Sequence, residues 1–205
     1  MAGMREEKAR KTRAKLVAVA RRLFAKNGFA ATSTEEILDK AGVTRGALYH
    51  HFADKAALFE AVCIALHEEA VAAIGKAADD SAGPFEALLE GSRAWLAHFA
   101  RPEVNRILIV EAPAVLGWEK WNALDAAHGF GELMQGVEAA RKAGAIRDIA
   151  AEELAVLLNG AMNAAVLWSG HKGGKAPARM EKALTELLTA LKRDRTKTWS
   201  RSSFP

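Results

Sequence analysis

Residues 33–58 read STEEILDKAGVTRGALYHHFADKAAL, and the local signals in this stretch predict two short helices joined by a tight turn. Ser33 precedes Glu36 by three residues, which is the spacing of a capping box at the start of a helix. Gly42 supplies the left-handed residue that ends this helix. Thr44 is placed as the N-cap of the next one. The pair has the dimensions of a helix-turn-helix.

The second helix of the pair, from Thr44 to about His51, has a surface suited to duplex DNA. Eight residues rising about 1.5 Å each form a rod of about 12 Å, which fits the major groove. The side chains offer donors, acceptors and one permanent cation, and none of them is a carboxylate. We therefore expect this helix to lie in the major groove.

Two residues break local rules in a way that a nearby phosphate backbone would explain. Gly46 lies inside a helix, where glycine costs about 0.5–1 kcal/mol relative to alanine. It allows another surface to come close, or it only allows close packing on the preceding helix. Lys55 lies in the first turn of the helix after Asp54, where the dipole disfavours a cation by roughly 0.3–1 kcal/mol. A DNA phosphate at this helix N-terminus would make the position of the lysine favourable. The alternative is that Lys55 is simply solvated.

Charge is distributed unevenly along the chain. Residues 1–55 contain 12 Lys and Arg against 6 Asp and Glu, residues 56–191 contain 12 against 18, and residues 192–205 contain 5 against 1. A basic N-terminal part followed by an acidic one indicates that the first part meets a polyanion and the second does not. The alternative is a basic face that is merely solvated.

The composition is that of a folded protein, since 50% of the 205 residues are hydrophobic and only 5 are proline. The single cysteine, Cys63, cannot form an internal disulfide, and the N-terminus lacks a secretory pattern, so we expect a cytoplasmic protein. The uncharged stretch from Leu154 to His171 is interrupted by polar side chains, which favours a buried helix over a membrane span.

Apolar residues recur with the spacing of a helix in every segment long enough to judge, so the fold is predicted to be all-α. We expect helices at about 6–26, 33–41, 44–51, 54–76, 85–99, 102–111, 151–170 and 178–194, with a turn from Pro113 to Gly117 and an interrupted helical region at 118–143.

Three segments carry a resemblance to a known family. Residues 28–37 (GFAATSTEEI), 41–52 (AGVTRGALYHHF) and 54–58 (DKAAL) closely resemble the DNA-binding signature of the TetR/AcrR family of bacterial transcriptional regulators. The resemblance implies a homodimer that binds a palindromic operator and usually represses transcription until a small molecule binds. It divides the chain into a three-helix, homeodomain-like DNA-binding head at 1–54, a larger helical ligand-binding and dimerisation domain at 55–196, and a basic tail at 197–205.

The same resemblance assigns DNA contacts by position. Thr44, Arg45 and Ala47 would face base edges, and Arg45 is the best candidate to read a guanine through its O6 and N7. Gly46 would let the backbone approach. Phosphate contacts would fall to Thr32, Ser33, Tyr49, His50 and Lys55. The core of the head is expected to contain Ile37, Leu48 and Phe52. Further basic residues either reach a phosphate or the minor groove or belong to a disordered tail: Arg5, Lys8, Arg10, Lys11 and Arg13.

The last two helices are predicted to form a dimer interface. The helix at 151–170 has no charge from Leu154 onward, so it needs cover on all sides. The helix at 178–194 presents an apolar seam of Met180, Leu184, Leu187 and Leu191. The pair is similar to the family's last two helices, which build a four-helix bundle across the dimer axis. Alternatively, the seam closes only the monomer's own core.

Aromatic and methionine residues of the second domain are candidates for an effector pocket, because such side chains line adaptable apolar cavities. They are Trp95, Trp118, Trp121, Phe130, Met134, Met162 and Trp168. Selectivity is assigned to the polar residues among them: Glu111, His128, Asn159 and Asn163. The alternative is that all of these are ordinary core residues with interhelical hydrogen bonds. The expected effector is an uncharged or weakly polar, partly aromatic molecule.

Catalytic and metal-binding patterns are not found in the sequence. The histidines occur without the spacing of a metal site, and the GHKGGK run from Gly170 to Lys175 lacks the phosphate-loop spacing. We therefore expect no enzyme activity, cofactor or metal, and a ligand-responsive repressor that binds DNA. The alternative is a helical ligand-binding or catalytic protein whose basic head does not bind specific DNA.

Overall fold

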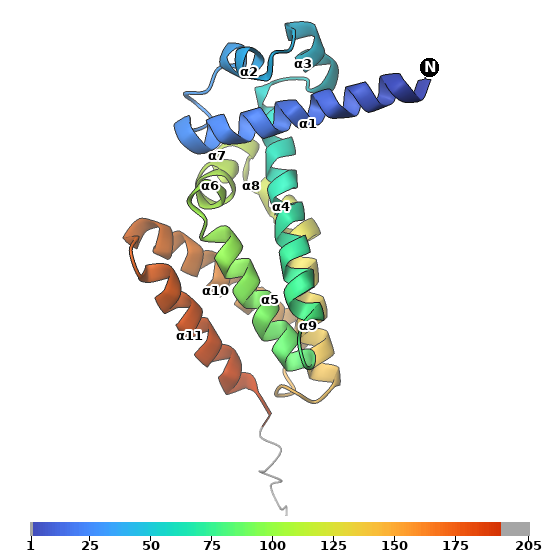
Figure 1. The fold of residues 1–205 in the computed structure, drawn as a ribbon. Helices are drawn as coiled ribbons and strands as arrows, with labels where there is room; N and C mark the ends of the chain where they lie inside the picture. The colour runs from blue at the N-terminus through green and yellow to red at the C-terminus, as the bar shows by residue number, and fades with distance from the viewer. Residues whose placement is uncertain (1, 194–205) are drawn as a thin grey trace, which may run out of the picture.

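The computed structural model describes residues 2–193, which form helices joined by short turns (Figure 1). The all-α prediction is confirmed. The elements are α1 (Ala2–Asn27), α2 (Thr34–Ala41), α3 (Arg45–His51), α4 (Lys55–Asp79), α5 (Pro84–Phe99), α6 (Pro102–Val104), the π-helix η1 (Asn105–Glu111), α7 (Ala112–Leu116), α8 (Trp118–Asp125), the π-helix η2 (Ala126–Phe130), α9 (Gly131–Lys142), α10 (Ala151–Lys172) and α11 (Ala176–Leu191).

The predicted caps set the ends of the short helices. Ser33 Oγ accepts a hydrogen bond from the Glu36 N–H at 3.0 Å, and Thr44 Oγ1 accepts one from Ala47 at 3.3 Å. Gly42 has φ +60° and ends α2 as expected. Within the described residues, Glu36 does not return the second bond of a capping box, so the cap at Ser33 is a simple one.

The head, which we define as residues 2–54, packs around the apolar face of α1. Leu16, Phe24, Ile37 and Leu48 are fully buried, and Phe52 is 5% exposed, so the predicted core of the head is confirmed. Phe59 of α4 extends this core downward, because its ring lies 5.2 Å from that of Phe24. Helix α4 therefore joins the head to the rest of the molecule through continuous packing.

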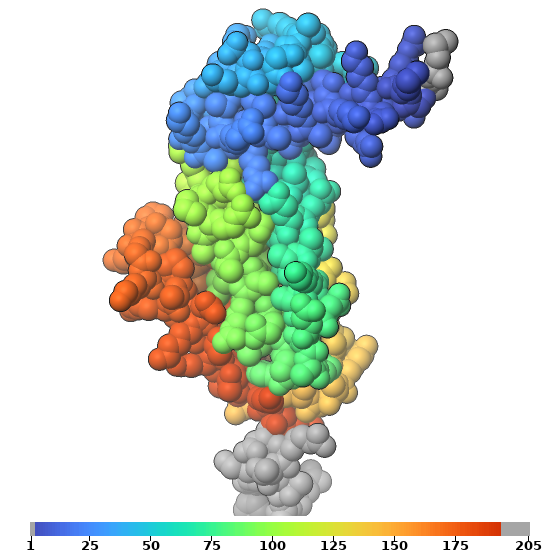
Figure 2. Space-filling model, viewed as in Figure 1, coloured from blue at the N-terminus to red at the C-terminus, as the bar shows by residue number. Residues whose placement is uncertain are grey.

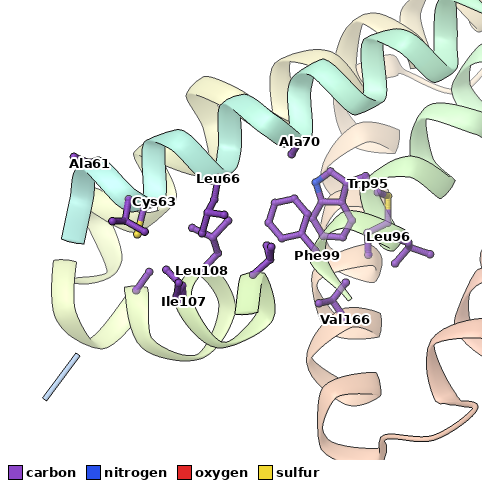
Figure 3. Close-up of a cluster of buried hydrophobic side chains, with 14 of the residues drawn as sticks. Ala61, Cys63, Leu66, Ala70, Trp95, Leu96, Phe99, Ile107, Leu108 and Val166 are labelled. Carbon is purple, nitrogen blue, oxygen red and sulfur yellow. The ribbon is translucent and has the colours of Figure 1, made fainter. Parts of the chain in front are cut away.

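The body, residues 55–193, is a bundle in which α4, α5, α9 and α10 surround the centre while α11 lies along α10 and α5 (Figure 1). Figure 3 shows the rings of Trp95 and Phe99 lying together between the helices, with Val166 of α10 close by. Their ring centroids are 4.2 Å apart at an interplanar angle of 17°. Figure 2 shows the head seated across one end of this bundle.

Three predicted boundaries need correction. The expected turn at Pro113 to Gly117 is the short helix α7, because Pro113 stands in a first turn, where its missing N–H is not needed. The expected helix at 102–111 divides into α6 and η1. Helix α1 begins at Ala2, so the alternative of a disordered N-terminal segment is wrong over the described residues.

The predicted basic tail at 197–205 and the end of the expected helix at 178–194 lie outside the described residues. Among the helices of residues 2–193, none combines the length and the apolar character needed to cross a bilayer.

A buried histidine in α4 makes the stability of the body sensitive to acid. His67 is 2% exposed, its ring lies 5.8 Å from those of Phe99 and His128, and neither ring nitrogen has a partner among the described residues. Burial, helped by the nearby His128 and His98, lowers the pKa of His67 to about 4. In the unfolded chain the pKa of a histidine is about 6.5.

We predict that His67→Leu reduces the acid sensitivity of folding. Between pH 6.5 and about 4, His67 is protonated in the unfolded chain but stays neutral in the folded protein. The free energy of unfolding therefore falls as the pH falls through this window. Thermal melting at about pH 7 and about pH 4.5 should show a smaller loss of Tm in the variant, by a few degrees. The exposed His50→Leu serves as the control, and an acid sensitivity of His67→Leu equal to the wild type would contradict the prediction.

Candidate DNA-binding surface and effector cavity

Helix α3 lies at the outer end of the head, away from the body (Figure 1). Its only buried residue is Leu48, which anchors it to the core. The predicted contact residues on α3 and its cap are exposed or half-exposed: Thr44, Arg45, Gly46, Ala47, Tyr49 and His50. Ser33 is exposed beside them at the start of α2. Seven of the nine predicted DNA-contact residues therefore lie on an accessible surface.

The Arg45 guanidinium is held only by weak surface contacts. Its side chain is 68% exposed, and Nη1 lies 3.7 Å from Glu35 Oε1 of α2. The guanidinium carbon lies 5.6 Å from the centre of the Tyr49 ring. An exposed ion pair of this length contributes about 1 kcal/mol at most. Arg45 is therefore oriented outward and remains available to another acceptor.

Gly46 is not required for packing inside the head. A Cβ atom at this position would meet no atom within 4 Å. The alternative that Gly46 only allows close packing on the preceding helix is therefore wrong. What the missing side chain leaves free is the outer surface of α3, where another molecule's backbone can approach.

Thr32 and Lys55 serve the fold of the head, and their predicted phosphate contacts are corrected. Thr32 is 1% exposed, and its hydroxyl donates to the Gly28 carbonyl at 2.7 Å. Lys55 Nζ donates to the carbonyl oxygens of Phe29 and Thr32, each at 2.9 Å, and lies 4.3 Å from the centre of the Phe29 ring. Two of its three donors are thus used inside the protein, and carbonyl oxygens offset the unfavourable position of a cation at a helix start.

Side chains of the body also hold the loop of residues 28–33 and the end of α1 that precedes it. Arg106 of η1 donates through Nη1 to the carbonyls of Ala25 and Lys26 at 3.1 and 2.9 Å, which satisfies acceptors at the end of α1. Arg106 Nε also donates to Glu111 at 3.1 Å, and Glu111 accepts a bond from the Phe29 N–H at 2.8 Å. Glu111 therefore lies at the junction of head and body, so its predicted place in the effector pocket is wrong.

The π-helical form of η1 accounts for this pairing. Residues five apart lie on one side of a π-helix, whose hydrogen bonds also span five residues, so Arg106 and Glu111 act together. Gly28, with φ +87°, passes directly over them, and a Cβ there would lie 2.7 Å from atoms of both side chains. The sequence contains the glycine as a helix stop but no periodic signal for its two body partners.

The basic residues of α1 line a helix that extends beyond α3 (Figure 2). Arg13 lies with its guanidinium carbon 5.3 Å from the centre of the Phe52 ring, just past the end of α3. The other predicted basic residues of this arm are exposed: Arg5, Lys8, Arg10 and Lys11. Sequence analysis missed Lys15, which is exposed next to Gly42 at the turn between α2 and α3.

A cavity of about 230 Å³ lies between α4, α5, α9 and α10. Trp95 and Met162, two of the predicted pocket residues, line it. Much of its wall comes from small residues that sequence analysis did not single out, including Gly91, Gly129 and Gly136. Glycine inside a helix is costly, which is the signal that could have identified them.

Four predicted polar and aromatic residues do not line this cavity. His128 stacks on His67, Asn159 donates to Asp125 at 3.1 Å, and Asn163 Oδ1 is buried without a partner among the described residues. Phe130 is half-buried against the core. Asp125, which is 5% exposed, was missed, and burial raises the pKa of its carboxyl.

The remaining residues predicted for the effector pocket do not line the cavity. Trp118 is 65% exposed, and Trp168 is 36% exposed with Arg179 over its ring. Trp121 packs on Trp118 and donates through its indole to the Leu108 carbonyl at 2.8 Å. Met134 packs against the core without lining the cavity. Aromatic identity alone did not distinguish the cavity wall from the surface.

The last two helices leave apolar side chains exposed in the single chain. The exposed set is Val156, Leu157, Leu167 and Trp168 on α10 and Leu187 on α11. The predicted apolar seam of α11 does not face one surface. Leu184 packs into the core of the chain and is 7% exposed, whereas Leu187 is 49% exposed. An apolar patch spread over two adjacent helices is typical of an interaction surface.

Comparison with known proteins matches both parts of the chain. Residues 85–191, about half of it, match the family model described as the tetracyclin repressor-like C-terminal domain, and residues 16–62 match that of bacterial regulatory proteins of the tetR family. The chain belongs to the TetR family. A crystal structure of a TetR-family transcriptional regulator from Pectobacterium atrosepticum is 30% identical with a TM-score of 0.77, covering 92% of this chain and 97% of that one.

Curated relatives of this TetR-family chain match it over a segment of about 60 residues. The regulator TtgR of Pseudomonas putida is 48% identical over 63 residues, which is 31% of this chain and 30% of TtgR. AcrR of Shigella flexneri is 47% identical over 62 residues, or 30% of this chain and 29% of AcrR. The matched segment thus spans less than a third of either regulator. The crystal structure of RolR, solved with resorcinol, is 17% identical at a TM-score of 0.67, covering 89% of each chain, and shows the shared fold.

We predict that Lys55→Met weakens DNA binding without changing its salt dependence. The variant loses two part-buried hydrogen bonds to backbone carbonyls, so the free energy of unfolding should fall by about 1–3 kcal/mol. DNA affinity should fall for all sequences, because the loop that positions α2 loosens. Fluorescence anisotropy over a salt series measures the slope, with Lys76→Met at the far end of α4 as the control. A slope reduced by about one unit would restore Lys55 to the phosphate contacts.

Proposed function

We propose that this TetR-family chain is a sequence-specific DNA-binding regulator, and specifically a homodimeric repressor that a small, largely apolar effector releases from a palindromic operator. The observation that carries this proposal is the exposed surface of α3, which is free of carboxylates and centred on the outward Arg45. The uneven charge supports it, since the head is basic and the body acidic.

The proposed contacts follow the accessible residues. Thr44, Arg45 and Ala47 face base edges, and the Thr44 hydroxyl keeps its hydrogen for donation although its oxygen caps α3. Arg45 reads a guanine. Ser33, Tyr49 and His50 hold phosphates. The division of the chain at residue 54 into a DNA-binding and a ligand-binding, dimerising domain, with α4 joining them, belongs to the same proposal.

The proposed dimer forms through α10 and α11. Leu157, at 70% exposed, and the neighbouring apolar side chains would be removed from water by a twofold-related copy. Two heads are then carried by one rigid bundle, so that the two copies of α3 meet successive major grooves one helical turn, or a multiple of it, apart.

The proposed effector site is the cavity between α4, α5, α9 and α10. RolR, which shares the fold, was solved in complex with resorcinol, so one protein of this fold binds a single-ring aromatic ligand. We assign the chain no catalytic role, and we place it in the cytoplasm, where its DNA would be.

Selection of bound duplexes from a random DNA pool tests the proposed function. The expected product is a palindromic consensus whose half-sites lie about one helical turn, or a multiple of it, apart, with binding that weakens steeply as salt rises. Recovery of unenriched sequence from repeated rounds would count against sequence-specific regulation.

We predict that Arg45→Ala changes specificity as well as affinity. Binding to the selected operator should weaken by about 1–3 kcal/mol, and the preference at one base position in each half-site should relax. Titrations against the operator and its single-base variants measure both effects. Arg147→Ala, an exposed cation of the body, is the control for loss of charge. Equal losses on the operator and on random DNA would remove Arg45 from the base-reading residues.

We predict that Leu157→Glu dissociates the dimer. Leu157 is 70% exposed in the single chain, and a carboxylate there would be buried against its own copy. Light scattering at micromolar concentration should show a monomeric mass, and operator affinity should fall about tenfold or more because the two half-sites are no longer bound together. Val110→Glu, at an equally apolar exposed position on η1, should leave the mass dimeric. A wild type that is itself monomeric would overturn the interface.

A further inference from the structure

Gly129, in the wall of the cavity, lies close to one hydrogen-bond donor and one acceptor. A Cβ atom at Gly129 would lie 3.6 Å from Trp95 Nε1 and 3.5 Å from Asp125 Oδ1. Gly129 and Trp95 both line the cavity. Because Gly129 has no side chain, the space between the indole N–H and the carboxyl oxygen is open to whatever enters the cavity.

These polar groups are buried without a complete set of partners. Trp95 is 3% exposed and lines the cavity, and no hydrogen bond from its Nε1 is formed among the described residues. Asp125 is 5% exposed, its Oδ2 accepts from Asn159 at 3.1 Å, and Asn163 also bonds to this carboxyl, while Oδ1 lies on the side of Gly129. Asn163 Oδ1 is also buried without a partner in the described part of the chain. Since nearly all buried polar atoms are hydrogen-bonded, this cluster points to a polar group of a ligand.

The size and walls of the cavity limit the ligand to one ring. Its volume is about 230 Å³, whereas an apolar cavity of about 150 Å³ binds benzene. Ile74, Leu88, Leu133 and Met162 contribute apolar walls. A single aromatic ring with one or two small substituents fits this space, and a drug of several fused rings does not.

The groups around the cavity disfavour an anionic ligand, and their hydrogen-bonding pattern suits a neutral hydroxyl. No lysine or arginine lines it, and Glu132 and the adjacent Asp125 would repel a carboxylate. An ammonium group carries three donors, for which the open Oδ1 of Asp125 is a single acceptor. A hydroxyl group both accepts and donates, so it matches one N–H and one carboxyl oxygen.

We propose that the effector is a small neutral phenol, whose ring lies among the apolar walls and whose hydroxyl accepts from Trp95 Nε1 and donates to Asp125 Oδ1. This inference rests on the proposed function, because it names the ligand class of the proposed effector site. Gly129 is the specificity-determining residue, since its missing side chain admits the hydroxyl.

Matched ligand pairs test the inference on the unmodified full-length protein without DNA. Phenol and m-cresol are compared by calorimetry with toluene and m-xylene, which have nearly the same shapes but no hydroxyl. The phenols should bind about tenfold or more tightly, because the hydroxyl satisfies two buried groups. Benzoate and benzylamine should bind more weakly than phenol. Equal affinities within the pairs, tighter binding of either charged ligand, or no binding of any compound up to its solubility limit would each overturn the proposal.

Two variants locate the hydroxyl. Asp125→Asn should lower phenol affinity about tenfold and leave toluene affinity unchanged, since only the carboxyl acceptor is replaced, by a weaker amide. Gly129→Ala should lower phenol affinity more than toluene affinity, because its methyl group takes the place of the hydroxyl. That methyl group meets no protein atom closer than 3.5 Å, so this variant keeps the test decisive if Asp125→Asn does not fold. Arg147→Ala, which is exposed and outside the cavity wall, is the control. Unchanged phenol affinity in Gly129→Ala would overturn the placement.

Failure of this inference is separable from failure of the proposed function. If the protein selects an operator but binds no phenol, only the ligand class is wrong. If it binds phenols at Gly129 but selects no DNA sequence, the ligand site stands and the regulator proposal falls. Release of the selected operator by phenol, and its loss in Gly129→Ala, would support both.

Discussion

The position of the head on the body depends on the loop of residues 28–33, whose backbone is held from two sides by half-buried charged side chains. Lys55 donates to its carbonyls from α4, and Glu111 accepts its Phe29 N–H from η1. Charge-assisted hydrogen bonds to backbone are stronger than neutral ones, and their partners here are rigid helices. The orientation of α2, and with it of α3, is therefore set by side chains that belong to the body.

This arrangement also places the head under the influence of the bundle. η1 holds the end of α1 through Arg106, and its other neighbours include α10, where Asn105 donates to the Val166 carbonyl at 3.3 Å. Helix α10 in turn lines the cavity through Met162 and carries exposed apolar residues outward. One short π-helix thus contacts the element that positions the recognition surface and the element that forms the cavity wall.

Glycines form part of the cavity wall, and they act in two ways. Gly91 and Gly136 allow Ile74 and Leu88 to approach them at 3.3 to 3.4 Å from an ideal Cβ position, while Gly129 leaves the space between Trp95 and Asp125 open. Protein interiors are otherwise packed to crystal density, so such a space is retained at a cost in stability. The buried polar atoms at its end add to that cost and require a partner.

The sequence by itself determined the local structure: the all-α fold, the caps at Ser33, Thr44 and Asp54, the stop at Gly42 and the outward surface of α3. These follow from hydrogen bonds between residues three or four apart, which are visible in any short stretch. Tertiary structure alone decided that Lys55 and Thr32 hold the loop, that Glu111 joins head to body, and which aromatic residues line the cavity. Those outcomes depend on pairs separated by tens of residues, such as Phe29 and Glu111, and no helical period encodes which distant side chain will meet a given backbone group.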